Sequence, residues 1–444
     1  MDNNVDLIQM LEARDRRVRR QSELLECYRL PLVSFTMNIA GPVKNSSAIR
    51  RGFQLGRELL LGQLMRVKAP LVHQEELDAV TGCEGLYVAD ISAQALKAIT
   101  LEIEEQTELG RLFDMDVLSP GGEKLERPNP RRCLICGRPA AACARSRTHT
   151  VPELQRKTRE LLDAALDHHD AETVSSLAVR ALLYEVSVTP KPGLVDRENS
   201  GSHRDMDFYT FLSSASVLYP YFSKCFSVGR ETAAEPAPET FAKLRAPGKL
   251  AEGRMLQASG GVNTHKGAIF TLGVICGALG RLAWEDRHSP AAVLAEASAM
   301  TRGVEQELAA APENTHTAGQ RFFARYGVTG VRGQAAAGFP TVLEYGLPIL
   351  EDGLRQGKSP DEAGAAALLA LLSRTTDTNM IARGGRETQI EKSARLQALL
   401  DAEPYPSRET LRALDREYTA ENLSPGGSAD LLALCWLLHF LRET

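Results

Sequence analysis

Apolar residues along the first part of the chain alternate between helical and extended spacing. A helical period covers residues 4–28, and an apolar, β-branched run follows at residues 32–39. The same signals predict further strands and helices, the strands at residues 65–73, 85–91 and 109–118 and the helices at residues 47–64 and 92–108. We therefore predict an α/β (α+β) domain at residues 1–165.

Beyond residue 165 the strand signals disappear, and nearly every apolar segment has helical spacing. Residues 151–169 are expected to form a helix that joins the two halves, and further helices are predicted at residues 175–188 and 208–222. Polar, proline-containing loops are predicted at residues 233–238 and 246–248. The pattern favours a larger all-α domain at residues 166–444, and two domains are the natural expectation for a chain of 444 residues.

The composition is that of a globular protein and argues against several classes of function. A formal net charge of −5 leaves no surplus of Lys and Arg for neutralising phosphates, so we expect no nucleic-acid partner. No run of about 18 apolar residues is present, and the acidic first residues do not resemble a signal peptide, so we expect no membrane association. Eight cysteines in so long a chain do not indicate a disulfide framework, and we expect a cytoplasmic enzyme.

Two acids within the segment at residues 109–118 suggest a metal site. Asp114 and Asp116 alternate with apolar residues, so in a strand both carboxylates lie on one face. Neighbouring carboxylates repel each other unless a cation lies between them, and Asp-x-Asp at a strand end is how nucleotidyltransferase-like folds hold Mg²⁺ against a triphosphate. The alternative is a pair of solvated acids on the face of an edge strand.

A glycine turn follows the first predicted strand and is a candidate phosphate cradle. Residues 40–46 contain Lys44, and the helix that begins near Ser47 offers free N–H groups and the positive end of its dipole. The turn is not a Walker A loop, which needs a longer glycine spacing and a Lys-Ser or Lys-Thr pair.

Three cysteines and a histidine lie close together in the segment RRCLICGRPAAACARSRTH. Cys133 and Cys136 have the CxxC spacing that lets two thiolates bind one ion, and Cys143 and His149 could complete a tetrahedral Zn²⁺ site. Several arginines surround these residues and could bind a polyphosphate. Reduced structural thiols beside an arginine-rich phosphate surface are therefore the alternative to zinc.

Three motifs of the first half together resemble the apo-citrate lyase phosphoribosyl-dephospho-CoA transferases, or holo-citrate-lyase synthases. They are GPVKNSSAIRRGF, ELGRLFDMDVL and RRCLICGRPAAACARSRTH. The resemblance covers roughly residues 24–154. It implies transfer of a phosphoribosyl-dephospho-CoA group to a serine of the acyl carrier (gamma) subunit of citrate lyase, with release of pyrophosphate. It also implies Asp114 and Asp116 as catalytic Mg²⁺ ligands, with phosphate partners Lys44, Arg50 and Arg111. A related transferase serves malonate decarboxylase, so the carrier protein stays open.

The second half is organised around the stretch TPKPGLVDRENSGSHRDMD at residues 189–207. Two prolines stiffen its backbone and two glycines permit sharp turns. The stretch carries an unusual density of polar side chains for a loop, namely Lys191, Asp196, Asn199, His203, Asp205 and Asp207. The alternative is a capped connection between two helices with solvated charges.

Further polar segments interrupt the apolar helices downstream. Lys266 lies in the first turn of a predicted helix, next to Asn263 and His265, where the helix dipole disfavours a cation unless an anion binds. Other glycine-rich turns bear groups that suit a polyphosphate and metal site, namely Arg332, Asp377, Asn379, Arg383, Gly384 and Gly385. For the last segment, SPGGSAD, Ser428 as a helix cap with Asp430 in the first turn is a sufficient structural account.

Five motifs of the second half resemble triphosphoribosyl-dephospho-CoA synthases, and the resemblance covers residues 171–444. They are TPKPGLVDRENSGSHRDM, GVNTHKGAIF, RGQAAAGFP, DTNMIARGG and SPGGSADLLA. This resemblance implies that ATP and 3'-dephospho-CoA are joined through ribose with release of adenine. The candidate catalytic residues are Asp196, His203, Asp205 and Asp377, with Asp205 and Asp207 as Mg²⁺ ligands. The candidate substrate-binding residues are Lys191, Asn199, Asn263, His265, Lys266, Arg332, Asn379, Arg383, Gly384 and Gly385. The family pattern leads us to expect a glutamate where this chain has Gln334, so Gln334 is left out of the site.

The two resemblances together predict a fused bifunctional enzyme that makes and attaches the prosthetic group of citrate lyase. One alternative is an all-α ADP-ribosyl hydrolase with paired aspartates on Mg²⁺, which adenine release dependent on dephospho-CoA would exclude. Another is a nucleotide- or zinc-binding regulator, which would bind its ligand without turnover.

Overall fold

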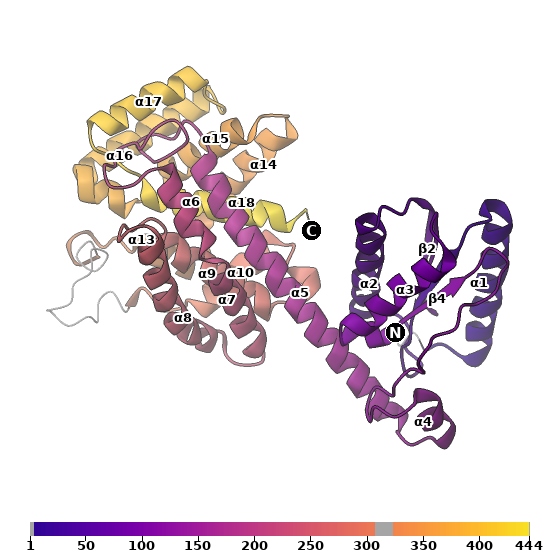
Figure 1. Cartoon of the computed structure of the whole chain (residues 1–444). Helices are drawn as coiled ribbons and strands as arrows, with labels where there is room; N and C mark the ends of the chain where they lie inside the picture. Colours follow the sequence, from indigo (N-terminus) through magenta and orange to yellow (C-terminus); the bar gives the residue numbers. More distant parts are fainter. Residues whose placement is uncertain (1–3, 307–322, 444) are drawn as a thin grey trace. The chain divides into compact units, whose positions relative to one another are not determined.

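The computed structural model describes residues 4–306 and 323–443, and these form two compact units, residues 1–169 and 170–444 (Figure 1). The division lies inside helix α5 (Val151–Ser187), so the two helices predicted at residues 151–169 and 175–188 are one continuous helix. The predicted fold class is confirmed, because the first unit mixes helices with a sheet and the second is helical wherever it has regular structure among the described residues.

The first unit is built on a four-stranded antiparallel sheet with the strand order β2-β3-β1-β4. The strands are β1 (Leu32–Met37), β2 (Leu71–Ala79), β3 (Gly82–Ala89) and β4 (Phe113–Leu118). The helices of this unit are α1 (Leu7–Tyr28), α2 (Ser47–Arg66), α3 (Ala93–Gln106), the 3-10 helix η1 (Leu109–Leu112) and α4 (Ala140–Ser146), followed by the first part of α5.

The two faces of this sheet pack against different helices. On one face Phe35, Tyr87 and Phe113 are fully buried with the apolar residues of α2 and α3. On the other face a smaller cluster forms between α1 and the sheet, in which Leu24 and Leu25 pack against Leu32, Leu86 and Val88. The alternation of β4 follows from this arrangement, since Phe113, Met115 and Val117 face the larger core and the two aspartates face the opposite side.

Two strand predictions in this unit overlapped residues that are helical in the structure. The strand predicted at residues 65–73 is the end of α2 followed by β2, because Leu60 and Leu64 continue the buried side of the helix almost to its last residue. The strand predicted at residues 109–118 begins only at Phe113, because Leu109–Leu112 form a 3-10 turn whose leucines are already buried.

The second unit consists of the rest of α5 and of shorter helices. They are α6 (Phe208–Ser216), α7 (Tyr219–Glu231), α8 (Ala237–Ala258), α9 (Lys266–Arg281), η2 (Trp284–Asp286), α10 (Pro290–Met300), α13 (Gly330–Ala336), η3 (Val342–Gly346), α14 (Leu347–Arg355), α15 (Pro360–Arg374), α16 (Thr378–Ala402), α17 (Arg408–Ala420) and α18 (Gly426–Leu441). No helix among the described residues is both long and apolar enough to span a membrane.

Three helices that are apolar on all sides form the centre of this unit. Helix α9 packs against α7, α8, α10 and α18, and its residues from Leu272 to Gly280 are all buried. Helices α15 and α18 pack against each other and are buried along most of their length. A helix surrounded by other helices needs no polar face, which explains why the run from Ala363 to Leu372 in α15 is apolar and buried.

One helix prediction and one loop prediction in this unit also need correction. The helix predicted at residues 208–222 is interrupted between α6 and α7, where Pro220 occupies the start of the second helix. The loop predicted at residues 246–248 lies inside α8, which continues through Pro247 because Leu244, Ala251 and Met255 are all buried on one side of the helix. Packing of the apolar side therefore outweighs the missing N–H of one proline.

Candidate active sites and a candidate metal centre

Asp114 and Asp116 lie on one face of the edge strand β4, as the alternation predicts. In the β1–β4 pairing they stand opposite Thr36 and Ser34, and their side chains are 43% and 32% exposed. Each carboxylate contacts a cation of the chain. Asp114 Oδ1 lies 2.9 Å from a guanidinium nitrogen of Arg131, and Asp116 Oδ2 lies 2.5 Å from Nζ of Lys124. The two acids are thus accessible and lie in a positively charged environment.

A third acid of this region, Glu104 on α3, was missed by the sequence analysis. Its buried carboxylate accepts hydrogen bonds from the backbone N–H of Met115 at 2.8 Å and from Arg131 at 2.8 Å, and it also binds Arg127. Burial raises the pKa of Glu104, while Arg131 in particular opposes that shift. The available signal was the polar stripe Lys97, Thr100 and Glu104 at helical spacing, which is buried along its whole length.

The three predicted phosphate partners of the first unit do not contact the paired acids directly. Lys44 donates to the backbone oxygen of Ile39 at 2.6 Å just beyond β1, and burial lowers the pKa of its amine. Arg50 donates to Asn45 at 3.1 Å. Arg111 donates to the backbone oxygen of Cys133 at 2.9 Å and pairs with Glu108.

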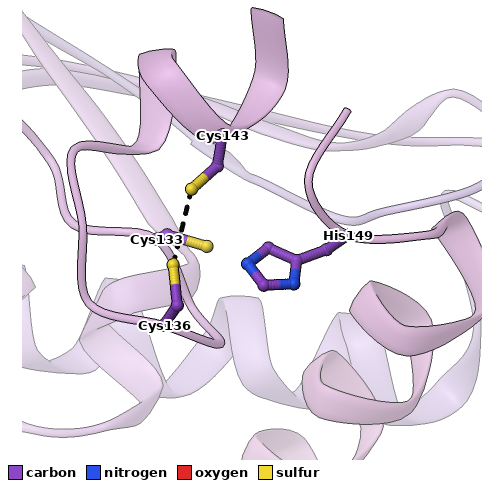
Figure 2. Close-up of side chains that lie close together, drawn as sticks. All are labelled: Cys133, Cys136, Cys143 and His149. Carbon is purple, nitrogen blue, oxygen red and sulfur yellow. Dashed lines mark hydrogen bonds between the residues drawn. The ribbon is translucent and has the colours of Figure 1, made fainter. Parts of the chain in front are cut away.

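Cys133, Cys136, Cys143 and His149 converge on one point (Figure 2). Their ligand atoms all lie within 4.8 Å of one another, and Sγ of Cys136 is 3.4 Å from Sγ of Cys143. Nε2 of His149 is buried without a hydrogen-bond partner. A contact with His149, assisted by Arg138, lowers the pKa of Cys136 to about 5, whereas the neighbouring Cys136 raises the pKa of Cys143. The set has the composition and spacing of a four-coordinate metal centre.

The segment that carries the cysteines also carries an arginine that reaches one of the paired acids. The backbone N–H of Cys133 donates to the backbone oxygen of Arg138 at 2.7 Å. The backbone N–H of Gly137 donates to the backbone oxygen of Cys133 at 3.1 Å, and the two bonds close a tight turn. Arg131, two residues before Cys133, donates to Asp114, to Glu104 and to the oxygen of Phe113. The metal-ligand cluster and the Asp114 site therefore share one segment of backbone.

In the second unit a cavity collects many of the residues that the sequence singled out. It is lined by seven of the predicted site residues, Lys191, His203, Asn263, His265, Lys266, Asn379 and Arg383, together with Glu185 and Asp430. The first residues of three helices also line it, namely Lys266 to Ala268 of α9, Asn379 of α16 and Gly426 of α18. The cavity thus has both positive side chains and exposed helix N-termini.

The stretch at residues 189–207 is held in place by one of its own acids and by an acid of α17. Asp196 is 2% exposed and accepts hydrogen bonds from the backbone N–H groups of Lys191, Glu198 and Asn199 at 2.7–3.0 Å. Asp415 on α17 accepts from Gly193 N–H and from the amide of Asn199. Gly193 has a φ of +69°, and a Cβ there would collide with the backbone of Leu423. Asp196 and Asn199 therefore shape the loop and do not line the cavity.

Lys191 and Glu185 form a buried ion pair at the wall of the cavity. Lys191 is 1% exposed, and its Nζ lies 2.5 Å from Glu185 Oε1 and 2.8 Å from the backbone oxygen of Glu185. Burial raises the pKa of Glu185, and the charge of Lys191 opposes that shift. The sequence does not single out Glu185, because one acid inside an amphipathic helix is typical of a solvated face.

Two histidines line the cavity in different settings. His265 is 2% exposed, its Nδ1 bonds to the Ser214 hydroxyl at 2.8 Å, and its Nε2 has no partner. Burial and then the charge of Lys191 lower the pKa of His265 to about 3, so its ring is neutral. His203 bonds to the Ser424 hydroxyl at 2.8 Å, and burial and then Arg383 lower its pKa as well.

Asp430 is the second acid of the cavity that sequence analysis set aside. Helix α18 begins at Gly426, and Ser428 is not its cap, because the N–H and hydroxyl of Ser428 donate to Asp377. Asp430 therefore lies beyond the first turn and faces the start of α9. A Cβ at Gly267 would collide with Oδ2 of Asp430, so any larger residue at that point of α9 would displace the carboxylate from its observed position.

The remaining predicted site residues lie outside the cavity. Asp205 has a 64% exposed side chain, and Asp207 caps α6 through Thr210. Asp377 is buried and caps α16 while accepting from Ser428. Among the other residues, Gly385 interrupts the helical geometry of α16 with a φ of +88°, and Arg332 and Gly384 do not line the cavity. Their roles in binding or catalysis stay predictions.

Comparison with known proteins divides the chain at the same place as its contacts do. Residues 5–165 match the family model CitX, apo-citrate lyase phosphoribosyl-dephospho-CoA transferase, and residues 171–444 match CitG, ATP:dephospho-CoA triphosphoribosyl transferase. Protein CitXG of Haemophilus influenzae is 34% identical over 97% of this chain and 95% of its own length, and Protein CitXG of Leuconostoc mesenteroides subsp. cremoris is 31% identical over 97% and 96%. A probable 2-(5''-triphosphoribosyl)-3'-dephosphocoenzyme-A synthase of Albidiferax ferrireducens is 42% identical over 61% of this chain and 91% of its own length.

Proposed function

Because this chain belongs to both the CitX and the CitG families, we propose that it performs two successive reactions on one prosthetic group. It is a bifunctional transferase of citrate lyase prosthetic-group synthesis. The C-terminal unit converts ATP and 3'-dephospho-CoA to 2'-(5''-triphosphoribosyl)-3'-dephospho-CoA and adenine. The N-terminal unit then transfers phosphoribosyl-dephospho-CoA to a serine of the citrate lyase acyl carrier subunit and releases pyrophosphate.

The observation that carries the first reaction is the convergence of three helix N-termini on the cavity. The first turns of α9, α16 and α18 all contribute lining residues. Helix N-termini offer unpaired N–H groups and partial positive charge, which suit a triphosphate. Lys266 and Arg383 add full positive charges at the same cavity, so we assign the triphosphate of ATP to this region.

The buried groups of the cavity would then surround the ribose and the adenine. Lys191 is fixed by Glu185 and by the backbone, so its position is set before substrate arrives. His265 is neutral and has a free Nε2, which makes it a hydrogen-bonding group for the substrate. Fixed dipoles and charges of this kind can stabilise a positively charged ribose in the transition state.

In the N-terminal unit, Asp114 and Asp116 are the residues that would hold Mg²⁺. The fit is supported by two accessible carboxylates on one strand face, since Mg²⁺ prefers oxygen ligands. When bound, the ion would neutralise charge on the triphosphate as pyrophosphate leaves. Arg131 and Lys124 already face these acids and would lie close to the substrate phosphates, while Lys44, Arg50 and Arg111 supply further positive charge to this unit.

The cysteine cluster would hold one structural Zn²⁺ through Cys133, Cys136, Cys143 and His149. A tetrahedral site with Zn–S bonds of about 2.3 Å places its sulfurs roughly 3.8 Å apart, close to the observed 3.4 Å between Cys136 and Cys143. The buried, unpartnered Nε2 of His149 further supports a metal ligand at this position. All four positions are filled by protein, which favours a structural role.

Zinc content and domain-specific activity test this site together. Protein purified without chelators should contain about one zinc per chain, and Cys136→Ser should lose most of it. Because the loop positions Arg131, Cys136→Ser should also slow carrier modification while adenine release continues. Cys27→Ser is the matched control, since Cys27 is an exposed cysteine outside the cluster. Less than about half an equivalent of zinc in the wild-type protein would reject the tetrahedral site.

Mass spectrometry of the apo carrier subunit tests the two reactions together. After incubation with ATP, Mg²⁺, 3'-dephospho-CoA and this protein, the carrier should gain the mass of one phosphoribosyl-dephospho-CoA group. Adenine should appear only when dephospho-CoA is present. The malonate decarboxylase carrier, offered in parallel, should be modified far more slowly. The free cysteines of the described residues fit a reducing compartment, so we place both reactions in the cytoplasm.

A further inference from the structure

Departure of adenine from ribose leaves negative charge on the purine, so a proton donor is needed within the cavity. From the placement of Asp430 we propose that its carboxyl group gives this proton to a ring nitrogen of the leaving adenine. The inference rests on the proposed first reaction and adds a catalytic residue to it. Neither family description assigns any role to this side chain.

Asp430 lies in the cavity close to the backbone at the start of α9. It lines the cavity from α18, and its carboxylate lies against Gly267 at the start of α9, where a Cβ would displace it. Among the described residues no cation forms an ion pair with Asp430. The acid therefore lines the cavity without an ion-pair partner that would keep it charged.

The charges around Asp430 favour its protonated form. Burial raises the pKa of Asp430 well above its usual value, the negative charges of Glu185 and Asp377 raise it further, and the N–H of Ala268 opposes the shift. The charged and titratable groups facing this cavity from the packed elements are Glu185 of α5, Lys191 and His203 of the loop, His265 and Lys266 at α9, and Arg383 of α16. Lys191 is engaged by Glu185, and both histidines have lowered pKa values, so neither imidazole holds a spare proton at neutral pH.

The proposed step conserves atoms and charge. The C1'–N9 bond of ATP breaks, and its electron pair leaves with adenine as the Asp430 proton is transferred to the purine. The 2'-hydroxyl oxygen of dephospho-CoA forms the new bond to C1', and its proton restores the Asp430 carboxyl group. Over one turnover the proton on free adenine therefore comes from the acceptor hydroxyl, and no further reactant is required.

The decisive variant is Asp430→Asn, which keeps the size of the side chain and removes its acid function. Dephospho-CoA-dependent adenine release should fall about 10²–10³-fold, within the range of general acid catalysis. Asp401→Asn, an exposed acid on α16 that bonds to Gln397, is the matched control and should keep wild-type activity. Tryptophan fluorescence reports folding of this unit alone, because both tryptophans of the chain, Trp284 and Trp436, lie in it.

Two readouts separate an acid from a merely structural residue. In the wild-type protein kcat/KM for ATP should fall as the pH rises through the raised pKa of Asp430, and this limb should be absent in Asp430→Asn. ATP analogues that lack N3 or N7 provide the second readout. The analogue that lacks the protonated nitrogen should be a poor substrate for the wild-type protein and should cause no additional loss in Asp430→Asn.

The outcomes distinguish this inference from the proposed function. Wild-type protein that releases no adenine with dephospho-CoA overturns the first reaction itself. Wild-type turnover together with an active Asp430→Asn variant overturns only the role of Asp430. If the variant does not fold, measurements on the wild type still decide, because a pH profile that stays flat and equal rates with both analogues would also reject a proton donor.

Discussion

The acids of the two candidate active sites differ in how far apart they lie along the chain. Asp114 and Asp116 stand two residues apart on one edge strand, and the alternation of that strand alone places both on the same face, opposite the larger core. In the second unit Glu185 and Asp430 come from α5 and α18, at opposite ends of the unit's sequence, and meet only in the folded bundle. A local pattern therefore locates the first pair but not the second.

The acids that the sequence made conspicuous in the second unit have mainly structural contacts. Asp196 organises the loop through three backbone N–H groups, and Asp377 joins the start of α16 to Ser428 on α18. Asp and Asn concentrate in loops because they satisfy backbone donors there. A dense group of polar residues in a loop can therefore stabilise the loop backbone as readily as it can form a catalytic site.

The largest expected effect is that of Asp114→Asn on the N-terminal reaction. Loss of this carboxylate should reduce carrier modification by at least about 10²–10³-fold, because strong electrostatic contacts to the transition state contribute that much. Adenine release should continue at the wild-type rate. Glu102→Gln, on the exposed side of α3, is the control. A parallel fall of both activities, or of neither, would contradict two separate sites.

Asp377→Asn should act next most strongly, and on stability. The variant weakens a helix cap and the bonds to Ser428, which should lower the free energy of unfolding by about 2–4 kcal/mol. The melting temperature, followed by tryptophan fluorescence, should fall by roughly 5–10 °C. Unchanged melting with lost adenine release would instead make Asp377 catalytic and remove the contrast between the two units.

The smallest effect is expected for Lys266→Met. Lys266 pairs with Glu252 at 3.0 Å, and the two side chains are 59% and 34% exposed, so loss of the pair should cost less than about 1 kcal/mol of stability. Loss of a charge-assisted phosphate contact should weaken ATP binding some ten- to hundred-fold. Glu252→Gln removes the same ion pair but keeps the cation, and it should bind ATP at least as well as the wild type. Normal ATP binding by Lys266→Met would make this lysine structural.

How much could be predicted from the sequence depended on the range of the interactions. The alternation in β4 and the long apolar runs of α9 and α15 were sufficient for the fold class, because both patterns are local. The course of α8 through Pro247 was not predictable, because tertiary packing decides it. Glu104, Glu185 and Asp430 were missed for a related reason: an acid within a helix reveals its burial only when its neighbours in space are known.

The contact between Gly267 and Asp430 has a consequence for reading related sequences. Because a Cβ at position 267 would occupy the space of the Asp430 carboxylate, the two positions are sterically linked although they lie far apart along the chain. They should change together in descendants of a common ancestor, with larger residues at 267 appearing only where 430 has become small. An aligned set of sequences would then reveal this pair as co-varying, and a chain with both glycine and aspartate would have inherited the same cavity wall.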